Sequence, residues 1–210
     1  MRARIPVAPE GWPFILIPGA AACALGWLGW WWPAGVLGLA ALAALGFFRD
    51  PERSAPEVPG AVLAPADGRV KEIREVQDPF VGEAVRVSIF LSPLDVHVNR
   101  SPIGALVTEV EYRPGRFLAA YRPEASEENE RCTLRLQAES ARVTVTQIAG
   151  VVARRVVCRV RPGDKLRAGE RFGLIRFGSR TDLFMPRGAD LRCRPGDKVR
   201  GGETIMGVLR

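Results

Sequence analysis

Residues 11–48 contain no charged side chain, and this run constrains the fold more than any other feature of the chain. It holds all five tryptophans together with many Ala, Leu and Gly residues. A hydrocarbon core about 30 Å thick needs about 20 apolar residues per helix, so the run predicts two short helices rather than one. Pro33, directly after three consecutive tryptophans, is the expected break between them. We therefore expect residues 1–48 to form a membrane-associated helical hairpin.

Basic residues flank this run on both sides. Arg2 and Arg4 precede it, and Arg49 and Arg53 follow it. Lys and Arg next to a membrane segment favour the cytoplasmic side. This predicts that both ends of the hairpin, and the domain that follows, lie at the cytoplasmic face of the cell membrane. The second arm, about residues 34–48, is short for a span, so a hairpin that dips into one leaflet and a single tilted span both stay open.

From residue 49 the chain is polar and mixed in charge, and we expect residues 49–210 to form one β-rich domain. Residues 85–91 and 142–148 alternate apolar and polar side chains, which is the period of a half-buried strand. Gly and Pro separate the strand patterns, and helical periodicity is missing outside the apolar run. The patterns predict a mostly β fold, a barrel or a sandwich.

One turn motif occurs twice in the second half of the chain. Residues 161–170, with the sequence RPGDKLRAGE, recur as residues 194–203, with the sequence RPGDKVRGGE. Each copy predicts a Pro-Gly-Asp turn, a short strand and a Gly-Glu turn that leads into an apolar strand. Such paired turns are similar to the barrel-sandwich hybrid of biotinyl and lipoyl carrier domains, which modify a Lys at a hairpin tip. The segment between the copies has no Lys, but it contains Gly178-Ser179.

Charge and cysteine content limit the partners. The formal charge of +7, from 30 basic and 23 acidic residues, suits an anionic lipid surface. No motif or basic helix supports nucleic-acid binding, so no nucleic-acid partner is expected. The cysteines show no CxxC spacing and no neighbouring His, which argues against a metal site and for a reduced domain. They are Cys23, Cys132, Cys158 and Cys193.

A Ser that follows Gly can cut its own chain. The hydroxyl of Ser179 can attack the carbonyl carbon of Gly178 in an N-to-O acyl shift, and the missing Cβ of Gly leaves that carbonyl open to close approach. Removal of the Cα proton of Ser179 then leaves dehydroalanine, and hydrolysis gives a pyruvoyl group. Its carbonyl can form a Schiff base with a substrate amine and act as an electron sink for decarboxylation. A Gly-Ser pair is also an ordinary turn sequence.

This chemistry needs a base near Ser179 and a group that orients the base. The chain has one histidine, His97, so a histidine base would be this residue. Asp67 and Asp95 are the candidate orienting carboxylates. Each also has a structural interpretation, since a lone His is often structural and an Asp-Gly pair is a common hairpin turn.

Four segments in a fixed order give the chain a family resemblance. The segments are FFRDPER at residues 47–53, PADG at residues 65–68, LSPLDVH at residues 91–97 and FGSRTD at residues 177–182. In this order they resemble the phosphatidylserine decarboxylases, in particular the short bacterial and archaeal branch of that family, over nearly the full length of the chain.

The resemblance implies a proenzyme that cleaves itself between Gly178 and Ser179. Residues 1–178 would become a β chain, and residues 179–210 an α chain that begins with a pyruvoyl cofactor derived from Ser179. The two chains would form a heterodimer, and a higher oligomer stays open. In this family the Asp of the Ala-Asp-Gly motif works with a His and the Ser in a serine-protease-like triad, which would here join Asp67 to His97 and Ser179. The substrate, the membrane lipid phosphatidylserine, would bind through its amine and leave as phosphatidylethanolamine.

Two positions depart from the family pattern. Longer members carry two histidines spaced His-x-x-His, and here the second position is Arg100, which cannot act as a base at neutral pH. Either His97 serves both cleavage and decarboxylation, or Asp67 acts more directly on Ser179. Arg100 is a candidate to bind the phosphate or carboxylate of the substrate, with a surface Arg as the alternative. Arg180, where longer members have a small Ser or Thr, is a candidate to steer the anionic headgroup, or else an ordinary strand residue.

Two other kinds of protein fit parts of the sequence. The repeated turns without a modified Lys fit a non-catalytic, membrane-tethered adaptor of the barrel-sandwich type. An ordinary serine hydrolase would use Ser179 as a nucleophile. The Gly-x-Ser-x-Gly elbow of many hydrolases is absent, because Phe177 and Thr181 hold its outer positions.

Overall fold

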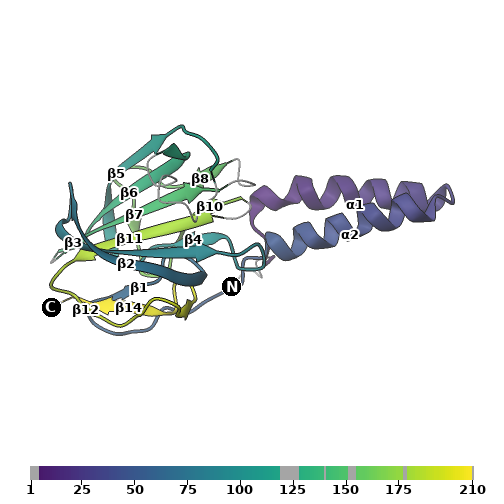
Figure 1. Ribbon diagram of the computed structural model, residues 1–210. Helices are drawn as coiled ribbons and strands as arrows, with labels where there is room; N and C mark the ends of the chain where they lie inside the picture. The colour runs from purple at the N-terminus through teal and green to yellow at the C-terminus, as the bar shows by residue number, and fades with distance from the viewer. Residues whose placement is uncertain (1–4, 119–127, 140, 151–154, 177–178, 210) are drawn as a thin grey trace. The chain divides into compact units, whose positions relative to one another are not determined.

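The computed structural model describes residues 5–118, 128–139, 141–150, 155–176 and 179–209 (Figure 1). The chain divides into two compact units, Met1–Glu52 and Arg53–Arg210. The first unit is helical, and the second contains all the described strands. Each unit is described separately below.

The first unit is a helical hairpin, as the uncharged run predicts. A short 3-10 helix, η1 (Pro9–Gly11), leads into α1 (Trp12–Trp27), and α2 (Trp31–Phe47) follows after a three-residue turn. The predicted break at Pro33 is wrong, because Pro33 lies in the first turn of α2. The first backbone N–H groups of a helix have no partner within it, so Pro is tolerated there. The chain turns instead at Gly29, whose φ of +81° suits a residue without a side chain.

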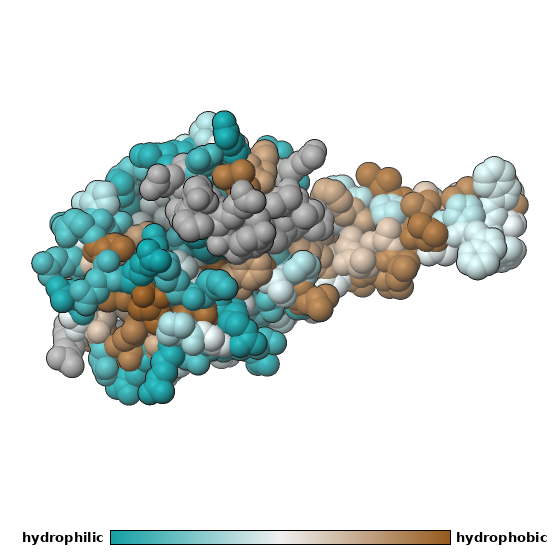
Figure 2. All heavy atoms as spheres, viewed as in Figure 1, coloured by the Kyte–Doolittle hydropathy of each residue, from teal (hydrophilic) through white to brown (hydrophobic). Residues whose placement is uncertain are grey.

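The surface of this hairpin is apolar. Neither helix contains a charged residue, and large side chains such as Ile17, Leu39 and Leu42 are about two-thirds exposed. In Figure 2 both helices are brown to white, without the strong teal of the β-rich unit. Among the described residues, no helix combines the length and the hydropathy needed to cross a membrane. Association of the hairpin with a membrane therefore stays a prediction.

The second unit is built almost entirely from strands. Its strands are β1 (Ala61–Leu63), β2 (Gly68–Asp78), β3 (Gly82–Leu91), β4 (Val98–Arg100), β5 (Ala105–Arg113), β6 (Arg131–Gln137), β7 (Arg142–Ala149), β8 (Val156–Cys158), β9 (Lys165–Leu166), β10 (Arg171–Ile175), β11 (Ser179–Pro186), β12 (Asp190–Leu191), β13 (Lys198–Val199) and β14 (Ile205–Val208). The mostly β fold is thus confirmed, and the two alternating segments lie in β3 and β7.

The strands form three antiparallel sheets. An eight-stranded sheet, in the order β13-β2-β3-β11-β7-β6-β5-β9, curls as a half barrel (Figure 1). Two three-stranded sheets have the orders β1-β14-β12 and β4-β10-β8. Two very short strands, β13 and β9, occupy the two edges of the large sheet, and each lies within one copy of the repeated turn motif.

The pairing order shows that the repeat is larger than the turn motif. Strands β4 to β10 pair as β4–β10, β10–β8, β9–β5, β5–β6 and β6–β7. The remaining strands repeat this pattern as β1–β14, β14–β12, β13–β2, β2–β3 and β3–β11. We call β4 to β10 the inserted half, and β1–β3 with β11–β14 the outer half, because the former interrupts the latter. Strands β11 and β7 pair with each other and join the two halves.

The two copies of the turn have matching geometry. Gly163 and Gly196 both have a φ of +97°. In each copy the Asp side chain accepts a hydrogen bond of 2.8 Å from the backbone N–H of the Arg three residues earlier, Asp164 from Arg161 and Asp197 from Arg194. Sequence identity in the two turns therefore reflects one conserved local structure within a duplicated fold.

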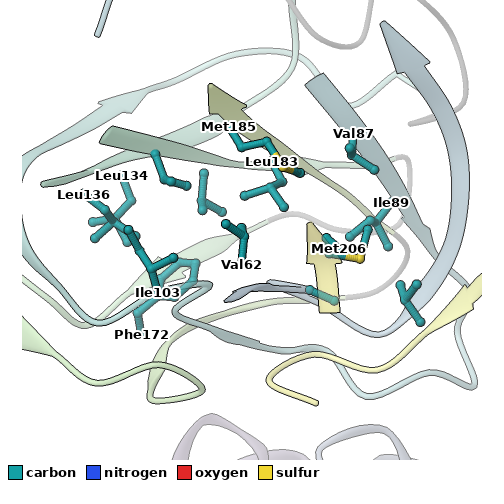
Figure 3. Close-up of a cluster of buried hydrophobic side chains, with 14 of the residues drawn as sticks. Val62, Val87, Ile89, Ile103, Leu134, Leu136, Phe172, Leu183, Met185 and Met206 are labelled. Carbon is teal, nitrogen blue, oxygen red and sulfur yellow. The ribbon is translucent and has the colours of Figure 1, made fainter. Parts of the chain in front are cut away.

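The hydrophobic core lies between the large sheet and the two small ones. Val87, Leu183 and Leu136 come from the large sheet, and Val62 and Phe172 come from the small sheets. Figure 3 shows these side chains converging on one another. All five are fully buried, and burial of each such side chain contributes about 1.5–3 kcal/mol. This core fixes the place of β11, which carries Ser179 at its first residue.

Candidate functional site

Ser179 begins a strand that is held from both sides. Its backbone pairs with Leu91 of β3 and with Ala149 of β7. The predicted cleavage partner, Gly178, lies outside the described residues. The bond that is predicted to be cut, between residues 178 and 179, therefore comes directly before β11, a central strand of the large sheet.

A buried polar cluster lies two residues further along β11. The Nδ2 of Asn99 donates to the Oγ1 of Thr181 at 3.2 Å and to the backbone O of Pro65 at 3.3 Å. The Nε2 of Gln147 donates to the Oδ1 of Asn99 at 2.7 Å. All three side chains are 0% exposed, so each of these hydrogen bonds is protected from water and costly to lose. Because Thr181 accepts from Asn99, its own hydroxyl proton can be donated to another acceptor.

His97 is fully buried just before β4. Its Nδ1 lies 2.9 Å from the backbone O of Asp95. A carbonyl oxygen can only accept, so Nδ1 carries the proton and Nε2 is the basic nitrogen of the neutral ring. The carboxylate of Asp95, one of the two candidate orienting groups, accepts from the backbone N of Ser92. The backbone N of Ile175 donates to the O of His97, which places His97 beside the segment that leads to Ser179.

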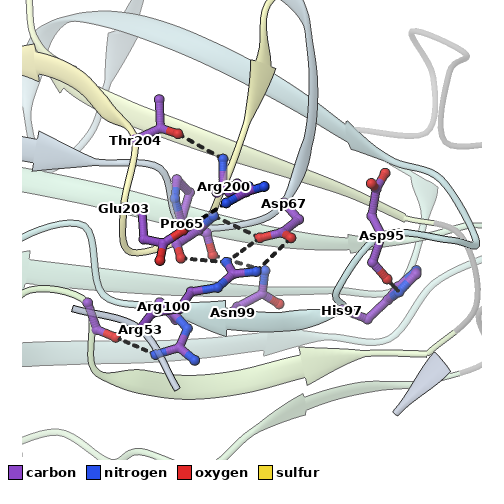
Figure 4. Close-up of polar contacts among 12 residues, drawn as sticks. Arg53, Pro65, Asp67, Asp95, His97, Asn99, Arg100, Arg200, Glu203 and Thr204 are labelled. Carbon is purple, nitrogen blue, oxygen red and sulfur yellow. Dashed lines mark hydrogen bonds and ion pairs between the residues drawn. The ribbon is translucent and has the colours of Figure 1, made fainter. Parts of the chain in front are cut away.

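Asp67 forms an ion pair that the sequence did not suggest. Its two carboxylate oxygens accept from Nη1 and Nη2 of Arg53 at 2.5 and 2.8 Å, and the backbone N of Gly201 donates to Oδ1 at 2.8 Å. The side chains of Arg53 and Asp67 are only 7% and 12% exposed. These hydrogen bonds link Asp67 to Arg53 and Gly201, and none of them joins it to His97 (Figure 4).

The two candidate substrate-binding arginines are both largely buried. Arg100 is 2% exposed and donates from Nη1 to the backbone O of Gly169 at 3.1 Å. Arg180 forms a two-point ion pair with Asp182, in which both N···O distances are 3.0 Å. The Arg180 and Asp182 side chains are 9% and 3% exposed. Arg180 is therefore already engaged by a carboxylate, whereas Arg100 lines a pocket of about 650 Å³ that also contains Lys165 and Arg167.

Hydrogen bonds connect the four sequence motifs into one network, the third motif through two residues that follow it. Arg53 of the first motif binds Asp67 of the second. Pro65, also of the second motif, accepts from the side chain of Asn99 and from the backbone N of Arg100, two and three residues after the third motif. Asn99 in turn reaches Thr181 of the fourth motif. The motifs are far apart in sequence, and the fold brings them together at the start of β11.

Two thiols lie near the same end of the large sheet. Cys132 of β6 and Cys158 of β8 belong to a small apolar cluster with Ala149, the backbone partner of Ser179. A hydrogen bond from Cys132 lowers the pKa of Cys158 to about 7, while the same interaction and burial raise that of Cys132. Cys193, by contrast, has its pKa raised to about 11 by burial and by the charge of Asp197.

Known proteins resemble this chain throughout its length. The sequence profile of the phosphatidylserine decarboxylase family matches residues 41–207. A phosphatidylserine decarboxylase proenzyme of Nitrosomonas eutropha is 47% identical over 209 residues, which cover 97% of this chain and 95% of that protein. The proenzyme of Burkholderia ambifaria is 46% identical, with coverage of 97% and 96%. That of Nitrosomonas europaea is 48% identical over 184 residues, which cover 87% and 85%.

The β-rich unit thus carries a buried polar network at Thr181, two residues into β11. The matches in sequence show that the chain belongs to the phosphatidylserine decarboxylase family, and hence to the carboxy-lyases. The resemblance inferred from the four motifs is confirmed.

Sequence reasoning missed the residues that tie the motifs together. The sequence assigns Arg53 no role beyond a flanking charge and the last position of the first motif, although it is the partner of Asp67. It assigns none to Asn99 or Gln147, and Thr181 enters only as an outer position of the absent hydrolase elbow. A usable signal was present for Gln147, because it stands between the β-branched Thr146 and Ile148 in a segment with the pattern of a strand.

Proposed function

We propose that the chain is a proenzyme that cuts itself between Gly178 and Ser179 and then decarboxylates phosphatidylserine to phosphatidylethanolamine. The pyruvoyl group derived from Ser179 would supply an electron sink for the loss of CO₂. The observation that carries the proposal is the hydrogen-bonded network of the four motifs, which ends on Thr181, two residues after Ser179. In a purely structural β unit, burial of so many polar groups would cost desolvation free energy with no functional gain.

The residues around the start of β11 fit such a group. Described side chains there include the amides of Asn99 and Gln147 and the hydroxyl of Thr181, beside the buried ion pair of Arg180 with Asp182. Amide N–H and hydroxyl groups can donate to a carbonyl or stabilise negative charge on oxygen. Buried donors of this kind suit an electron-withdrawing carbonyl.

His97 is the proposed base. The backbone O of Asp95 holds Nδ1 as the donor, so Nε2 can accept a proton. Complete burial removes water as a competing proton acceptor. With Arg100 at the second family position, His97 is assigned to both cleavage and decarboxylation.

Asp67 is proposed to act by positioning. Its ion pair with Arg53 and its bond to Gly201 hold the segment that begins with Pro65, and Pro65 holds Asn99. The triad of the wider family, in which this Asp works with the His, would need Asp67 to exchange Arg53 for His97. For Arg180 to steer the headgroup, the substrate would have to displace the Asp182 carboxylate from its guanidinium.

The cleaved chain is proposed to remain one particle. Residues 179–210 would comprise β11 to β14, which pair with β3, β7, β2 and β1. Leu183, Met185, Val199 and Met206 of this fragment are at most 1% exposed. Burial of these side chains contributes about 6–12 kcal/mol if each gives about 1.5–3 kcal/mol, so the two chains should stay associated as a heterodimer.

Membrane attachment is proposed to come from the helical hairpin. Both helices are uncharged and apolar on all sides, which is typical of helices that are covered by lipid or protein. Helices of 16 and 17 residues are about 24–26 Å long. The substrate is a membrane lipid, so an anchor at the cytoplasmic face of the cell membrane would keep the β unit beside it.

Replacement of Ser179 by Ala tests the proposal against a non-catalytic adaptor. The Ser179→Ala chain should stay uncut and release no labelled CO₂ from phosphatidylserine in mixed micelles. Ser88→Ala is the matched control, because Ser88 is a serine of the neighbouring strand β3, and it should be cut and active. A Ser179→Ala chain with full activity would contradict the proposal. An ordinary hydrolase is tested by borohydride with labelled substrate, which traps an amine adduct only if residue 179 carries a carbonyl.

A further inference from the structure

A hydrogen bond joins two thiols of the β unit, those of Cys132 and Cys158. Cys132 belongs to β6 of the large sheet and Cys158 to β8 of a small sheet. Both pack in one small apolar cluster, and the Cα atoms of the two strands come within 8 Å of one another. The contact therefore bridges two sheets at the end of the unit where β11 begins.

The strands that carry these thiols run alongside each other in the same direction. The Oε1 of Glu130, directly before β6, accepts from the backbone N of Val156 at 2.9 Å. Two residues further along each strand stand Cys132 and Cys158, so both contacts join residues 26 positions apart. Side chains two residues apart in a strand point to the same side. The fold itself therefore brings the two thiols together.

Both thiols adjoin the amide of Gln147. Cys132 is paired with Gln147 across β6 and β7, and Cys158 is paired with Gly173 across β8 and β10. A Cβ at Gly173 would lie only 2.8 Å from the Nε2 of Gln147, so this amide lies directly against Gly173. Gln147 donates to Asn99, and its Oε1 has no hydrogen-bond partner among the described residues. A single hydrogen bond therefore holds the amide, and a small shift of either thiol can displace it.

Cys158 is the better placed of the two thiols to react first. It is partly exposed, whereas Cys132 is buried. The hydrogen bond from Cys132 lowers the pKa of Cys158 to about 7, so about half of it is thiolate at pH 7. A thiolate attacks peroxides, and a neighbouring thiol can then close a disulfide.

We propose that Cys132 and Cys158 are a redox-sensitive pair that a hydroperoxide converts into a disulfide. The Cys158 sulfur attacks a peroxide oxygen, the O–O bond breaks, and Cys158 becomes a sulfenic acid while water or an alcohol leaves. The Cys132 sulfur then attacks the sulfenic sulfur, the S–O bond breaks, and water leaves. The two thiols are oxidised by two electrons, the peroxide is reduced by two, and both thiol protons end on the departing oxygens.

The disulfide should slow the chemistry at the start of β11. An S–S bond of about 2.0 Å is shorter than any contact between two thiols, so its formation draws β6 and β8 together. The Gln147 amide is in contact with both strand pairs, so it shifts, and its 2.7 Å hydrogen bond to Asn99 weakens. Asn99 in turn holds Thr181. This consequence rests on the proposed function, whereas formation of the disulfide does not.

Peptide mapping of the full chain in detergent tests the pair directly. All chains carry Cys23→Ser, because Cys23 is exposed and would join two molecules. Hydrogen peroxide at pH 7 should link the peptides of Cys132 and Cys158 and lower the mass by about 2 Da, the two hydrogens lost. A reductant should reverse both changes. Cys193→Ala is the matched control, because Cys193 is also a buried cysteine of the β unit, and it should form the same link.

Release of labelled CO₂ from phosphatidylserine in mixed micelles tests the consequence. The oxidised wild type should be at least about fivefold slower than the reduced wild type, and a reductant should restore its rate. Cys158→Ala should match the reduced wild type before and after peroxide treatment. Direct attack of peroxide on the reactive carbonyl would affect both chains equally, so the difference between them measures the pair.

Two results would overturn the proposal. One is a peroxide-treated wild type without the link between Cys132 and Cys158. The other is a linked chain that keeps the rate of the reduced chain. A reduced wild type that releases no CO₂ would instead contradict the proposed function, and the peptide map would still decide whether the pair forms.

Discussion

The outer and inserted halves of the β unit share one order of strand pairing but differ where the chemistry lies. Each copy of the repeated turn pairs with the start of a long strand, β2 in the outer half and β5 in the inserted half. The residue directly before β2 is Asp67, and the residue directly before β5 is Gly104. In the inserted half, only four residues separate β6 from β7. In the outer half the corresponding strands, β3 and β11, are separated by the whole inserted half, and β11 begins at Ser179.

This difference shows that the scaffold and the site are separable. The inserted half makes the same pairings without Asp67 and without a Gly-Ser junction, and the threonine two residues into its own strand, Thr144, binds the carboxylate of Asp78 rather than an amide. The site residues are therefore additions to a fold that does not need them. Changes at these residues should affect the two halves unequally, and the predictions below test this from the largest expected effect to the smallest.

Loss of the Asp67 carboxylate should give the largest change in stability. Asp67→Ala removes the carboxylate that balances the charge of the buried Arg53 guanidinium, and breaking a buried ion pair in this way typically costs about 3–5 kcal/mol. The measurement is urea unfolding in a Ser179→Ala background, so that all chains have the same covalent state. Asp190→Ala is the control, because its ion pair with Arg192 is exposed and should be worth about 0–1 kcal/mol. Equal losses in the two variants would contradict the structural role given to Asp67.

Removal of the Asn99 amide should have a smaller effect on stability and a clear one on processing. Asn99→Leu leaves the Nε2 of Gln147 without its acceptor, at a cost of about 1–3 kcal/mol. Because Asn99 also holds Thr181 and Pro65, cutting at Ser179 should be slower. A time course on denaturing gels measures this. Gln137→Leu, at the end of β6 in the inserted half, is the control, and a wild-type rate of cutting in Asn99→Leu would exclude Asn99 from the site.

The cysteines of the two halves should differ in reactivity with no change in stability. At pH 8, Cys158, with a pKa of about 7, is mostly thiolate, while Cys193, with a pKa of about 11, is mostly thiol. The thiolate is the nucleophile, so iodoacetamide should label Cys158 before Cys193, and lowering the pH to 6 should slow the labelling of Cys158. Peptide mapping after timed quenching identifies the labelled residue. Faster labelling of Cys193 would contradict the hydrogen bond between Cys132 and Cys158.

Much of this arrangement could be predicted from the sequence, for physical reasons. An uncharged run and a strand alternation are local signals, so the hairpin, β3 and β7 were found. The repeat of the turn was visible because its Pro-Gly-Asp geometry requires particular residues. The larger duplication was not visible, because strand pairing needs only apolar alternation and tolerates different sequences. The position of the break in the hairpin was wrong because Pro is accepted in a first helical turn.

The site was predicted less completely than the fold. Ser179, His97 and Asp67 were named through their motifs, but their contacts depend on the pairing of distant strands. The ion pair of Asp67 with Arg53 and the contact of Asn99 with Thr181 join residues 14 and 82 positions apart. No local pattern encodes such partners. Only the fold shows that Asp67 holds Arg53 and Gly201 in this arrangement.

Intact mass spectrometry of the purified chain tests the central claim most directly. The account predicts two fragments, residues 1–178 and residues 179–210, with the smaller one lighter than its sequence by the replacement of an N-terminal Ser with a pyruvoyl group. It should have no free N-terminal amine, and both fragments should elute together under native conditions. An active preparation that contains only the intact 210-residue chain would contradict the account.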